Sequence, residues 1–190
     1  RYACASCLRC MAFFNVVVND CWPTTISWTM IDYYLNPTPS FHSVRRAFSP
    51  LRAIIAKDGN TYFVVVNNDT MKDVACSLRV GNFSCNGKYY IDEIIDITVP
   101  ANSKCTYFEF PNLEGSEIFT IPFAVLYDKH GNMLSQNRKI DSLINEIPFS
   151  TPDIKFSIKN EKIVFESDVY VMGVCIDLDG DSKASDNIFD

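Results

Sequence analysis

Polar side chains and an aromatic ring stand next to one another in the segment Asn19-Asp20-Cys21-Trp22-Pro23. Trp22 and Trp28 are the chain's two tryptophans, and both lie in this part of the sequence. Indole faces pack against the C–H faces of sugar rings, while Asn and Asp side chains hydrogen-bond hydroxyl groups. The structural alternative is that Asp20 caps a turn and Trp22 packs in a core. The residue types therefore leave two interpretations open, a carbohydrate-binding loop and a buried turn.

A cysteine motif near the start of the chain suggests a metal site at first. Cys4-x-x-Cys7-x-x-Cys10 lacks the fourth cysteine that an iron–sulfur cluster needs, because Phe14 stands in that place. No second Cys-x-x-Cys or His pair follows to complete a zinc site. We interpret these cysteines as buried thiols at helical spacing.

An acidic stretch, Asp177-Leu178-Asp179-Gly180-Asp181, is similar to the start of a calcium-binding loop. The EF-hand pattern requires Gly at its sixth position and Glu at its twelfth, where Ser182 and Ile188 stand. A hairpin turn is the better interpretation. His42 and His130 lack a nucleophile-type sequence context and are interpreted as structural or solvated. The sequence thus predicts no metal site, no cofactor and no catalytic residue.

The elements around the polar loop indicate one βα unit. Met11 to Val18 is apolar on both faces of a strand, which is typical of a buried parallel strand covered by helices. Downstream, Phe41, Val44 and Phe48 share one face of a predicted short helix. Such a unit needs neighbours to complete its sheet. In a (β/α)8 barrel the loop after the strand lies at the C-terminal rim, where active sites are found. Residues 1–49 are therefore predicted to belong to a barrel.

Residues 50–146 alternate apolar and polar positions and turn often, which predicts an immunoglobulin-like β-sandwich. The predicted strands are Leu51–Ala56, Thr61–Val66, Val74–Val80, Tyr89–Val99, Cys105–Phe110, Pro122–Tyr127 and Met133–Ile140. Residues 147–190 are predicted to be an incomplete second domain of this kind, with strands Ile154–Ile158, Lys162–Glu166 and Val169–Asp177. The fold class is thus mainly β, with immunoglobulin-like sandwiches preceded by part of a barrel.

The composition of the chain restricts the classes of binding partner and the cellular compartment that we expect. The chain has 190 residues and a net charge of −6, with no basic stripe, so a nucleic-acid partner is not expected. No apolar run is long enough to span a bilayer, so no membrane partner is expected. The sequons at Asn68 and Asn82 are candidate glycosylation sites, and together with Cys76 and Cys85 nearby they favour an oxidising compartment. Both ends of the chain are expected to be cut from a longer protein.

Several stretches between residues 9 and 52 carry a family pattern: Arg9-Cys10-Met11, Asn19–Pro23, Ser27-Trp28, Ile31–Tyr34 and Val44–Pro50. Together they resemble the β-mannosidases of glycoside hydrolase family 2, which also includes β-galactosidase and β-glucuronidase. The resemblance implies that residues 1–49 are the last strand, rim loop and closing helix of the catalytic barrel. It also implies, less specifically, that the later residues are the sandwich domains that follow the barrel.

The chemistry implied by the resemblance is retaining hydrolysis of terminal β-D-mannose, in which one Glu acts as acid/base and another as nucleophile. Neither family glutamate has a match in this chain. Glu146 and Glu161 follow Asn, as the family's acid/base does, but they lie in a sandwich or linker context and not at a barrel rim. The chain alone is therefore expected to be inactive. Asn19, Asp20 and Trp22 would bind substrate at the rim. Val16 and Val17 depart from the Trp-Gln pair that the family usually carries there. The implied substrates are β-mannosides, manno-oligosaccharides or N-glycan-derived chains, and the implied location is lysosomal or secreted.

A second hypothesis comes from a different class of function. The sandwich could act as a carbohydrate-binding or scaffolding module without belonging to an enzyme. Its signature would be exposed aromatic side chains on one sheet face, for which Tyr62, Tyr89, Tyr90 and Tyr107 are the candidates. Strand alternation predicts that at least half of these rings are in the core.

Overall fold

A computed structural model describes residues 18–24, 29–113, 119–160 and 162–176. Within these ranges the chain forms two compact units. The larger unit comprises residues 50–171, and the smaller unit comprises residues 18–49 and 172–176.

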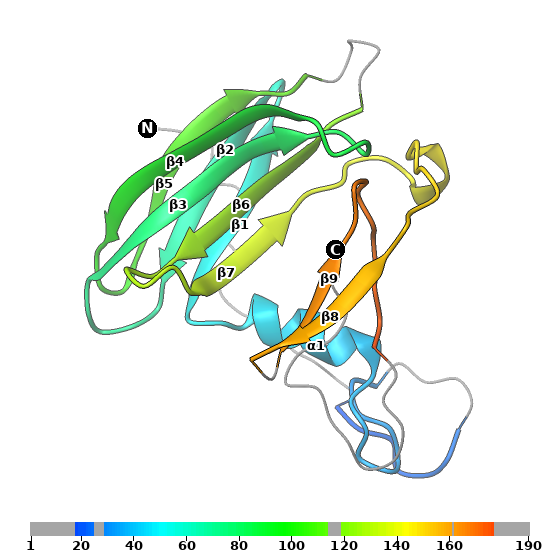
Figure 1. Ribbon diagram of the computed structural model, residues 1–190. Helices are drawn as coiled ribbons and strands as arrows, with labels where there is room; N and C mark the ends of the chain where they lie inside the picture. The colour runs from blue at the N-terminus through cyan, green and yellow to red at the C-terminus, as the bar shows by residue number, and fades with distance from the viewer. Residues whose placement is uncertain (1–17, 25–28, 114–118, 161, 177–190) are drawn as a thin grey trace. The chain divides into compact units, whose positions relative to one another are not determined.

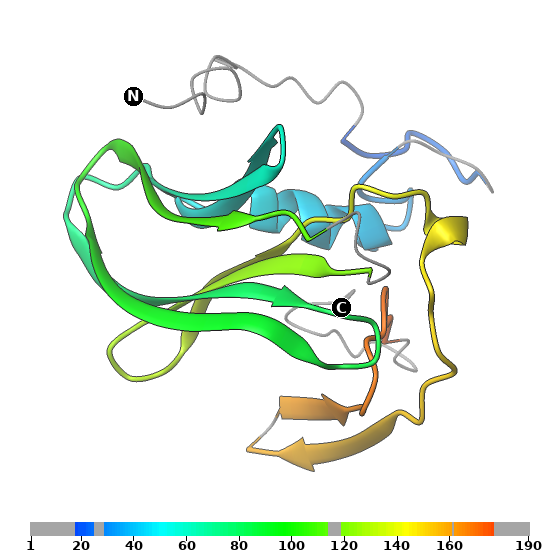
Figure 2. The ribbon, with the colours of Figure 1, turned by 90° about the horizontal axis from the view of Figure 1, so that it is seen from above.

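The larger unit contains a sandwich of two antiparallel sheets, which Figures 1 and 2 show as two layers. The strand order is β1-β2-β5 in one sheet and β4-β3-β6-β7 in the other. These strands are β1 (Leu51–Asp58), β2 (Thr61–Asn68), β3 (Val74–Phe83), β4 (Tyr89–Val99), β5 (Ser103–Pro111), β6 (Ile121–Tyr127) and β7 (Met133–Arg138). Sequential antiparallel strands need only short turns between them, which explains the frequent turn signals in the sequence.

Alternate residues of each strand build the core between the two sheets. Tyr62, Val64 and Val66 of β2 and Leu78 and Val80 of β3 all belong to this core and are almost completely buried. The same cluster contains Ala53, Ile55, Cys76, Val99, Phe110, Ala124 and Leu126. Removing this apolar surface from water is the main favourable contribution to folding of the unit.

A tight turn joins β6 to β7. The carboxylate of Asp128 accepts hydrogen bonds from the backbone N–H groups of His130 and Asn132, each at 2.8 Å. Gly131 has a φ of 81°, a left-handed conformation that side chains disfavour. The predicted hairpin turn at residues 129–132 is therefore confirmed.

A second apolar cluster forms on the opposite face of sheet β4-β3-β6-β7. Because side chains alternate along β6, Phe123 points away from the core that Ala124 faces. Phe123 shares the second cluster with Phe83, Cys85, Ile121, Ile147 and Tyr170. The backbone N–H of Tyr170 donates a hydrogen bond to the carbonyl of Cys85 at 2.8 Å. The chain after β7, which includes the short helix η3 (Ile144–Glu146), thus returns to cover part of this sheet.

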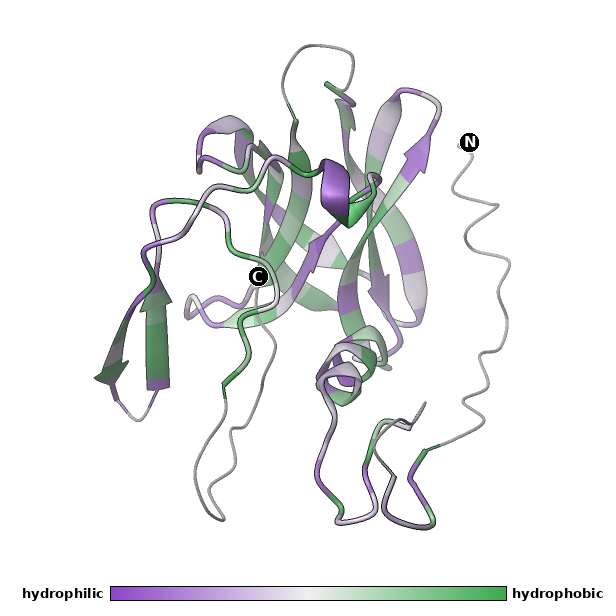
Figure 3. Cartoon of the chain, turned by 90° about the vertical axis from the view of Figure 1, so that its right-hand side faces the viewer, coloured by the Kyte–Doolittle hydropathy of each residue, from purple (hydrophilic) through white to green (hydrophobic). Residues whose placement is uncertain are grey.

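A separate two-stranded hairpin follows, formed by β8 (Lys155–Lys159) and β9 (Lys162–Glu166). Phe156 pairs with Phe165, and Ile158 pairs with Ile163. Phe156 and Ile158 are exposed, and Figure 3 shows apolar positions along this hairpin. Of the predicted strand Val169–Asp177, the described residues contain one bridge position, Val174, and no continuous strand. Tyr170 packs in the second apolar cluster instead.

The smaller unit contains the helix α1 (Pro39–Ala47). Pro39 lies in its first turn, where the missing N–H breaks no helical hydrogen bond, and Arg45 and Arg46 lie in its last turn. The predicted helix is confirmed, but its predicted apolar face is not fully covered, because Phe48 is exposed. His42 is the buried residue of this helix.

The mainly β fold with a sandwich is confirmed. The predicted barrel strand Met11–Val18 lies outside the described residues, apart from Val18, so the barrel origin of residues 1–49 stays a prediction. The division into domains at residues 1–49, 50–146 and 147–190 also stays a prediction. The acidic stretch at residues 177–181 and the cysteines at positions 4, 7 and 10 lie outside the described residues.

Candidate functional site

The polar loop of the smaller unit begins with a short parallel pairing of two chain segments. Asn19 and Ile31 form a parallel bridge. The N–H of Asp20 donates to the carbonyl of Ile31 at 3.2 Å, and the N–H of Ile31 donates to the carbonyl of Val18 at 3.0 Å. Figure 1 draws both segments in blue, at the two ends of a loop whose middle residues, 25–28, are not described. The backbone therefore fixes where Asn19 and Asp20 lie relative to residues 30–32.

Asp20 is half-buried and helps hold this loop. Its Oδ2 accepts a hydrogen bond from Oγ1 of Thr29 at 2.9 Å. The backbone carbonyls of Thr29 and Met30 accept bonds from Oγ1 of Thr38, at 3.2 and 3.0 Å. The chain segments before and after the tip at residues 32–36 are thus joined by side chains as well as by backbone. This network restricts where the Asp20 carboxylate can point.

Asn19 and Trp22 have a different environment from Asp20. The side chain of Asn19 is exposed and makes one long contact, 3.4 Å from its Nδ2 to the carbonyl of Asp20. Trp22 is 71% exposed, so it does not pack in a core as the structural alternative required. Trp28 lies outside the described residues. An exposed amide, a half-buried carboxylate and an exposed indole are groups that can bind a sugar.

A hydrogen-bonded turn with aromatic residues at its tip follows Ile31, which pairs with Asn19. Both oxygens of Asp32 accept hydrogen bonds from Asn36, from its backbone N–H at 2.7 Å and from its Nδ2 at 3.2 Å. The first of these bonds is the main reason that the pKa of Asp32 is lowered from its ordinary value. Leu35 has a φ of 66°, which is unusual for a residue with a side chain. The turn exposes Tyr33 and Tyr34, whose rings meet edge to face at 5.3 Å between centroids.

Sequence reasoning did not identify this turn. In the sequence, Asp32, Tyr33 and Tyr34 stand out only as residues of the family pattern. The spacing of Asp32 and Asn36 on either side of Leu35 is the local signal that could have indicated it, since Asp and Asn side chains often hydrogen-bond nearby backbone groups in turns.

The histidines and Glu146 lie in different elements of the part of the chain that the structure describes. No group of three or more His, Cys, Asp or Glu side chains within them gathers as metal ligands would. His42 is buried in α1, and His130 is exposed in the β6–β7 turn. Glu146 accepts a hydrogen bond from the backbone N–H of Leu143 at 3.3 Å and belongs to η3. Neither helix of the described part of the chain is long and apolar enough to cross a membrane.

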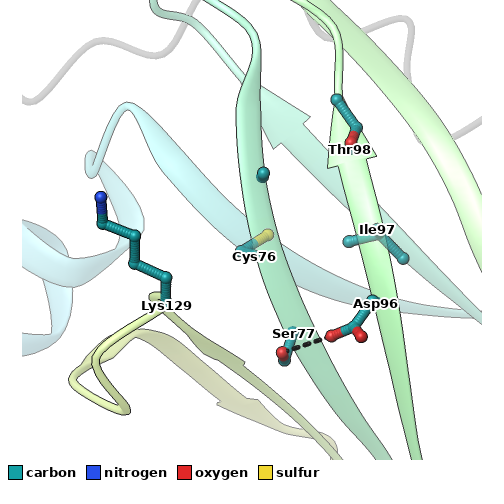
Figure 4. A pocket seen from close by; sticks show the side chains of 7 residues that line it. Cys76, Ser77, Asp96, Ile97, Thr98 and Lys129 are labelled. Carbon is teal, nitrogen blue, oxygen red and sulfur yellow. Dashed lines mark hydrogen bonds between the residues drawn. The ribbon is translucent and has the colours of Figure 1, made fainter.

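An open pocket of about 330 Å³ lies on the sandwich, between β3, β4 and the β6–β7 turn (Figure 4). Within it, Oγ of Ser77 donates a hydrogen bond to Oδ1 of Asp96 at 2.6 Å. Burial raises the pKa of the Cys76 thiol, which keeps this sulfur protonated and a weak nucleophile. The remaining lining residues are Ala75, Ile97, Thr98 and Lys129. The pocket has neither a pair of carboxylates nor an aromatic platform, so we assign it no role in sugar chemistry.

The tyrosines proposed for a carbohydrate-binding sandwich are mostly not available. Tyr62 is 2% exposed and its hydroxyl donates to Asp141 at 3.0 Å. Tyr107 is half-buried and donates to the carbonyl of Thr98 at 2.7 Å, and Tyr90 is also half-buried. Tyr89 alone of the four is exposed. A single ring does not form the row of aromatic side chains that this hypothesis predicts.

Both candidate glycosylation sites are buried in the sandwich. The Nδ2 of Asn68 donates to the carbonyls of Lys72, Val99 and Pro100 at 2.8, 3.1 and 3.1 Å. The Oδ1 of Asn82 accepts a hydrogen bond from the N–H of Ile91 at 3.1 Å. Both asparagines are 0% exposed, so a glycan on either nitrogen is not compatible with this packing. The structure therefore argues against glycosylation at these positions, although the sequons themselves are present.

Comparison with curated proteins gives short matches to β-mannosidases. The chain is 40% identical over 47 residues to a β-mannosidase B from Aspergillus terreus. It is 43% identical over 47 residues to a β-mannosidase B from Emericella nidulans. Each match covers 25% of this chain and 6% of the relative, so the match is to a small part of a much longer protein. No protein-family model matches the chain.

Comparison with solved structures gives a longer match. A crystal structure of a β-D-mannosidase from Dictyoglomus thermophilum matches 90% of this chain and 22% of its own, with a TM-score of 0.77 and 25% identity. An exo-chitosanase from Amycolatopsis orientalis matches 80% of this chain and 17% of its own, with a TM-score of 0.54 and 20% identity. The second match concerns the fold alone. The predicted resemblance to β-mannosidases is confirmed by both comparisons.

Proposed function

We propose that the chain is the C-terminal portion of a retaining β-mannosidase-like glycoside hydrolase, in which Asn19, Asp20 and Trp22 help form the sugar-binding rim. The observation that carries this proposal is that the sequence comparison and the structure comparison both match the chain to β-mannosidases. One is the 40–43% identity over 47 residues to fungal β-mannosidases. The other is the fold match over 90% of the chain to a bacterial β-mannosidase. The reaction proposed for the parent enzyme is hydrolysis of terminal β-D-mannose residues.

Within this proposal the chain contributes binding and not bond cleavage. A retaining mechanism needs two carboxyl groups about 5–5.5 Å apart, one as acid/base and one as nucleophile. The glutamates that perform these roles in the family have no counterpart in this chain. Glu146 accepts a hydrogen bond from the backbone N–H of Leu143 and belongs to a short helix of the larger unit. We therefore infer that the chain alone has no turnover.

The geometry of the loop supports a positioning role for each proposed residue. Asp20 is held by Thr29, so its carboxylate is already oriented before a sugar binds. Asn19 offers an exposed amide, which can both donate to and accept from hydroxyl groups. The exposed indole of Trp22 offers an apolar face for the C–H groups of a pyranose. Pre-organised polar groups beside an aromatic face bind sugars with little ordering cost.

The substrate class that follows is a β-mannoside, a manno-oligosaccharide or an N-glycan-derived chain. We include neither a nucleic acid nor a membrane among the proposed partners. The proposed location is lysosomal or secreted. The five described cysteines, Cys21, Cys76, Cys85, Cys105 and Cys175, are free thiols and add no support for that location.

Titration of the purified chain with mannose, followed by tryptophan fluorescence and calorimetry, tests the binding part of the proposal. Asn19→Ala and Trp22→Ala should each weaken binding by about three- to tenfold, since each removes one polar or apolar contact. Asn145→Ala and Tyr89→Ala remove an exposed amide and an exposed ring elsewhere, and both should bind as the wild type does. Absence of saturable mannose binding by the wild type would contradict the proposed rim.

Hydrolysis of an aryl β-mannoside tests the catalytic part. The chain should release no more aglycone than a buffer blank, because it lacks the carboxyl pair that the reaction needs. Turnover that rises with protein concentration and is lost in Glu146→Gln would contradict the inference that this chain contributes no catalytic acid.

A further inference from the structure

Three exposed aromatic side chains lie on two segments that leave the same short pairing. Trp22 follows Asn19 on the first segment, and Tyr33 and Tyr34 follow Ile31 on the second. The bridge between Asn19 and Ile31 is parallel, so both segments leave it in the same direction. Trp22 lies three residues beyond the bridge on its segment, and Tyr33 and Tyr34 lie two and three residues beyond it, at the tip of a turn. All three rings therefore stand beyond one end of the same parallel pair.

Hydrogen bonds close the turn that contains Tyr33 and Tyr34, and both side chains are exposed. The backbone closes it through the N–H of Asp32 on the carbonyl of Asn36, at 2.9 Å, and a second bridge joins Ile31 to Pro37. The Asp32 carboxylate adds its bonds to Asn36, and Leu35 accepts a left-handed backbone conformation. A turn fixed in this way keeps large side chains in solvent without losing order. Tyr34 is 68% exposed in this fixed position.

We propose that Tyr33 and Tyr34 bind the second sugar ring of an oligosaccharide whose first ring contacts Asn19, Asp20 and Trp22. This inference rests on the proposed function and extends it from one monosaccharide to the ring on the leaving-group side. Two aromatic contacts on separate segments suit two linked rings better than one ring. Tyrosine also suits such a ring because its face packs on C–H groups and its hydroxyl can bond the sugar's hydroxyls.

The test compares mannose with β-1,4-mannobiose and β-1,4-mannotriose by calorimetry on the full chain. The wild type should bind the two oligosaccharides at least about threefold more tightly than mannose, as expected for one added aromatic contact. The double variant Tyr33→Ala/Tyr34→Ala should lose that preference and keep its mannose affinity. Tyr34→Phe, which keeps the ring, should retain most of the preference. Tyr89→Ala, an exposed ring on the sandwich, should retain all of it.

Circular dichroism and thermal unfolding of each variant establish that the chain is folded before binding is compared. If mannose binds but mannobiose binds no more tightly, the second-ring inference is overturned and the proposed rim stands. If the double variant keeps the wild-type preference, the inference is overturned in the same way. If the preference is lost together with mannose affinity, the tyrosines belong to the first ring and the assignment to a second ring is wrong. If the wild type binds none of the three sugars, the proposed function itself is contradicted.

Discussion

An ion pair between Arg79 and Asp92 on the outer surface of the sandwich connects two neighbouring strands. Arg79 on β3 donates two hydrogen bonds to Asp92 on β4, Nε to Oδ1 at 2.7 Å and Nη2 to Oδ2 at 2.8 Å. The guanidinium also lies over the rings of Tyr89 and Phe123, at 5.1 and 5.6 Å from their centroids. Such bidentate geometry is stronger than an ordinary surface ion pair, and the flanking rings limit access of water.

The Arg79–Asp92 pair predicts a pH dependence of stability. The hydrogen bonds from Arg79 hold the pKa of Asp92 below its ordinary value. A carboxyl with a lowered pKa in the folded state stabilises the protein above its unfolded pKa, and this contribution is lost as the pH falls through the lower folded value. Both side chains are about one-third exposed, so solvent screening limits the effect to about 1 kcal/mol.

The measurement is urea unfolding of wild type and Asp92→Asn between pH 7 and pH 2. The free energies of unfolding of the two proteins should differ by about 1 kcal/mol at neutral pH and converge in acid. In acid Asp92 of the wild type is protonated, so it is neutral like the Asn of the variant. Asp73→Asn, which changes a carboxyl outside this pair, is the matched control. A constant difference across the whole pH range would mean that the charge of Asp92 does not stabilise the fold.

Asn68 is a second residue whose chemistry is structural. Its amide nitrogen donates to three backbone carbonyls, and its oxygen accepts bonds from the N–H and Oγ1 of Thr70, at 3.0 and 2.7 Å. Asn68→Ala would leave these buried groups without partners and should lower the free energy of unfolding by about 2–4 kcal/mol. Asn145→Ala, at an exposed position, should change it by less than about 0.5 kcal/mol.

Chemical denaturation of these two variants measures the predicted difference in the free energy of unfolding. Mass spectrometry of protein from a glycosylating host tests independently whether Asn68 carries a glycan. We expect no glycan on Asn68 in the folded protein, because its Nδ2 is buried and bonded. Folded protein carrying a glycan there would contradict the observed packing.

At the scale of elements, the sequence predicted the strands of the sandwich with differences at their ends. The predicted ranges of β4 and β9 agree with the structure, and β1, β2, β3, β5 and β6 differ at their ends by a few residues. The predicted strand Val169–Asp177 is not continuous over its described residues, where Val174 alone is a bridge position, and Tyr170 packs in an apolar cluster between chain segments. Local pattern shows that a residue will be buried, but not which element will bury it.

Local sequence pattern also does not show which segments of the candidate site lie side by side. Asn19, Asp20 and Trp22 stood out by residue type and by the family resemblance. The parallel pairing of Asn19 with Ile31 depends on two segments separated by a loop, which residue types alone do not indicate. The aromatic tip at Tyr33 and Tyr34 depends on the turn closed by Asp32, which no periodicity reveals.

Tyr170 offers a test of the second apolar cluster. Its ring lies 5.3 Å from Phe83 and stacks on Phe149 at 6.4 Å, measured between centroids. Tyr170→Ala should remove this packing and lower the free energy of unfolding by about 2–4 kcal/mol. It should also speed hydrogen exchange at the N–H of residue 170, which is bonded to the carbonyl of Cys85.

The matched control is Phe156→Ala, which removes an exposed aromatic ring of the β8–β9 hairpin. It should change the free energy of unfolding by less than about 1 kcal/mol, because little buried surface is lost. Equal effects of the two substitutions would show that the cluster around Tyr170 contributes nothing beyond an ordinary surface contact.

At the scale of the whole molecule, the two units differ in how completely they bury their apolar side chains. The sandwich encloses a continuous core in which Val64, Val66, Leu78 and Leu126 have no exposed surface. The described part of the smaller unit has no comparable core, since residues 18–49 and 172–176 contribute to neither apolar cluster. Its exposed large apolar side chains include Val18, Trp22, Tyr34, Leu35 and Phe48. Apolar surface of this kind in one part of a chain is a hazard for aggregation.

Deletion of residues 1–48 should therefore increase the soluble fraction of the protein without unfolding the sandwich. β1 begins at Leu51, and its pairing with β2 runs from Leu51–Asn68 to Asp58–Thr61, so the deletion leaves every residue pair of this ladder in place. The shortened chain keeps both apolar clusters, and a core of this size favours cooperative unfolding. The measurements are the soluble fraction on expression and the thermal unfolding curve. Deletion of residues 172–190 alone, which leaves the exposed aromatic loop in place, is the control and should improve solubility less. A shortened chain that is less soluble, or that unfolds without a cooperative transition, would show that residues before Leu51 are part of the sandwich fold.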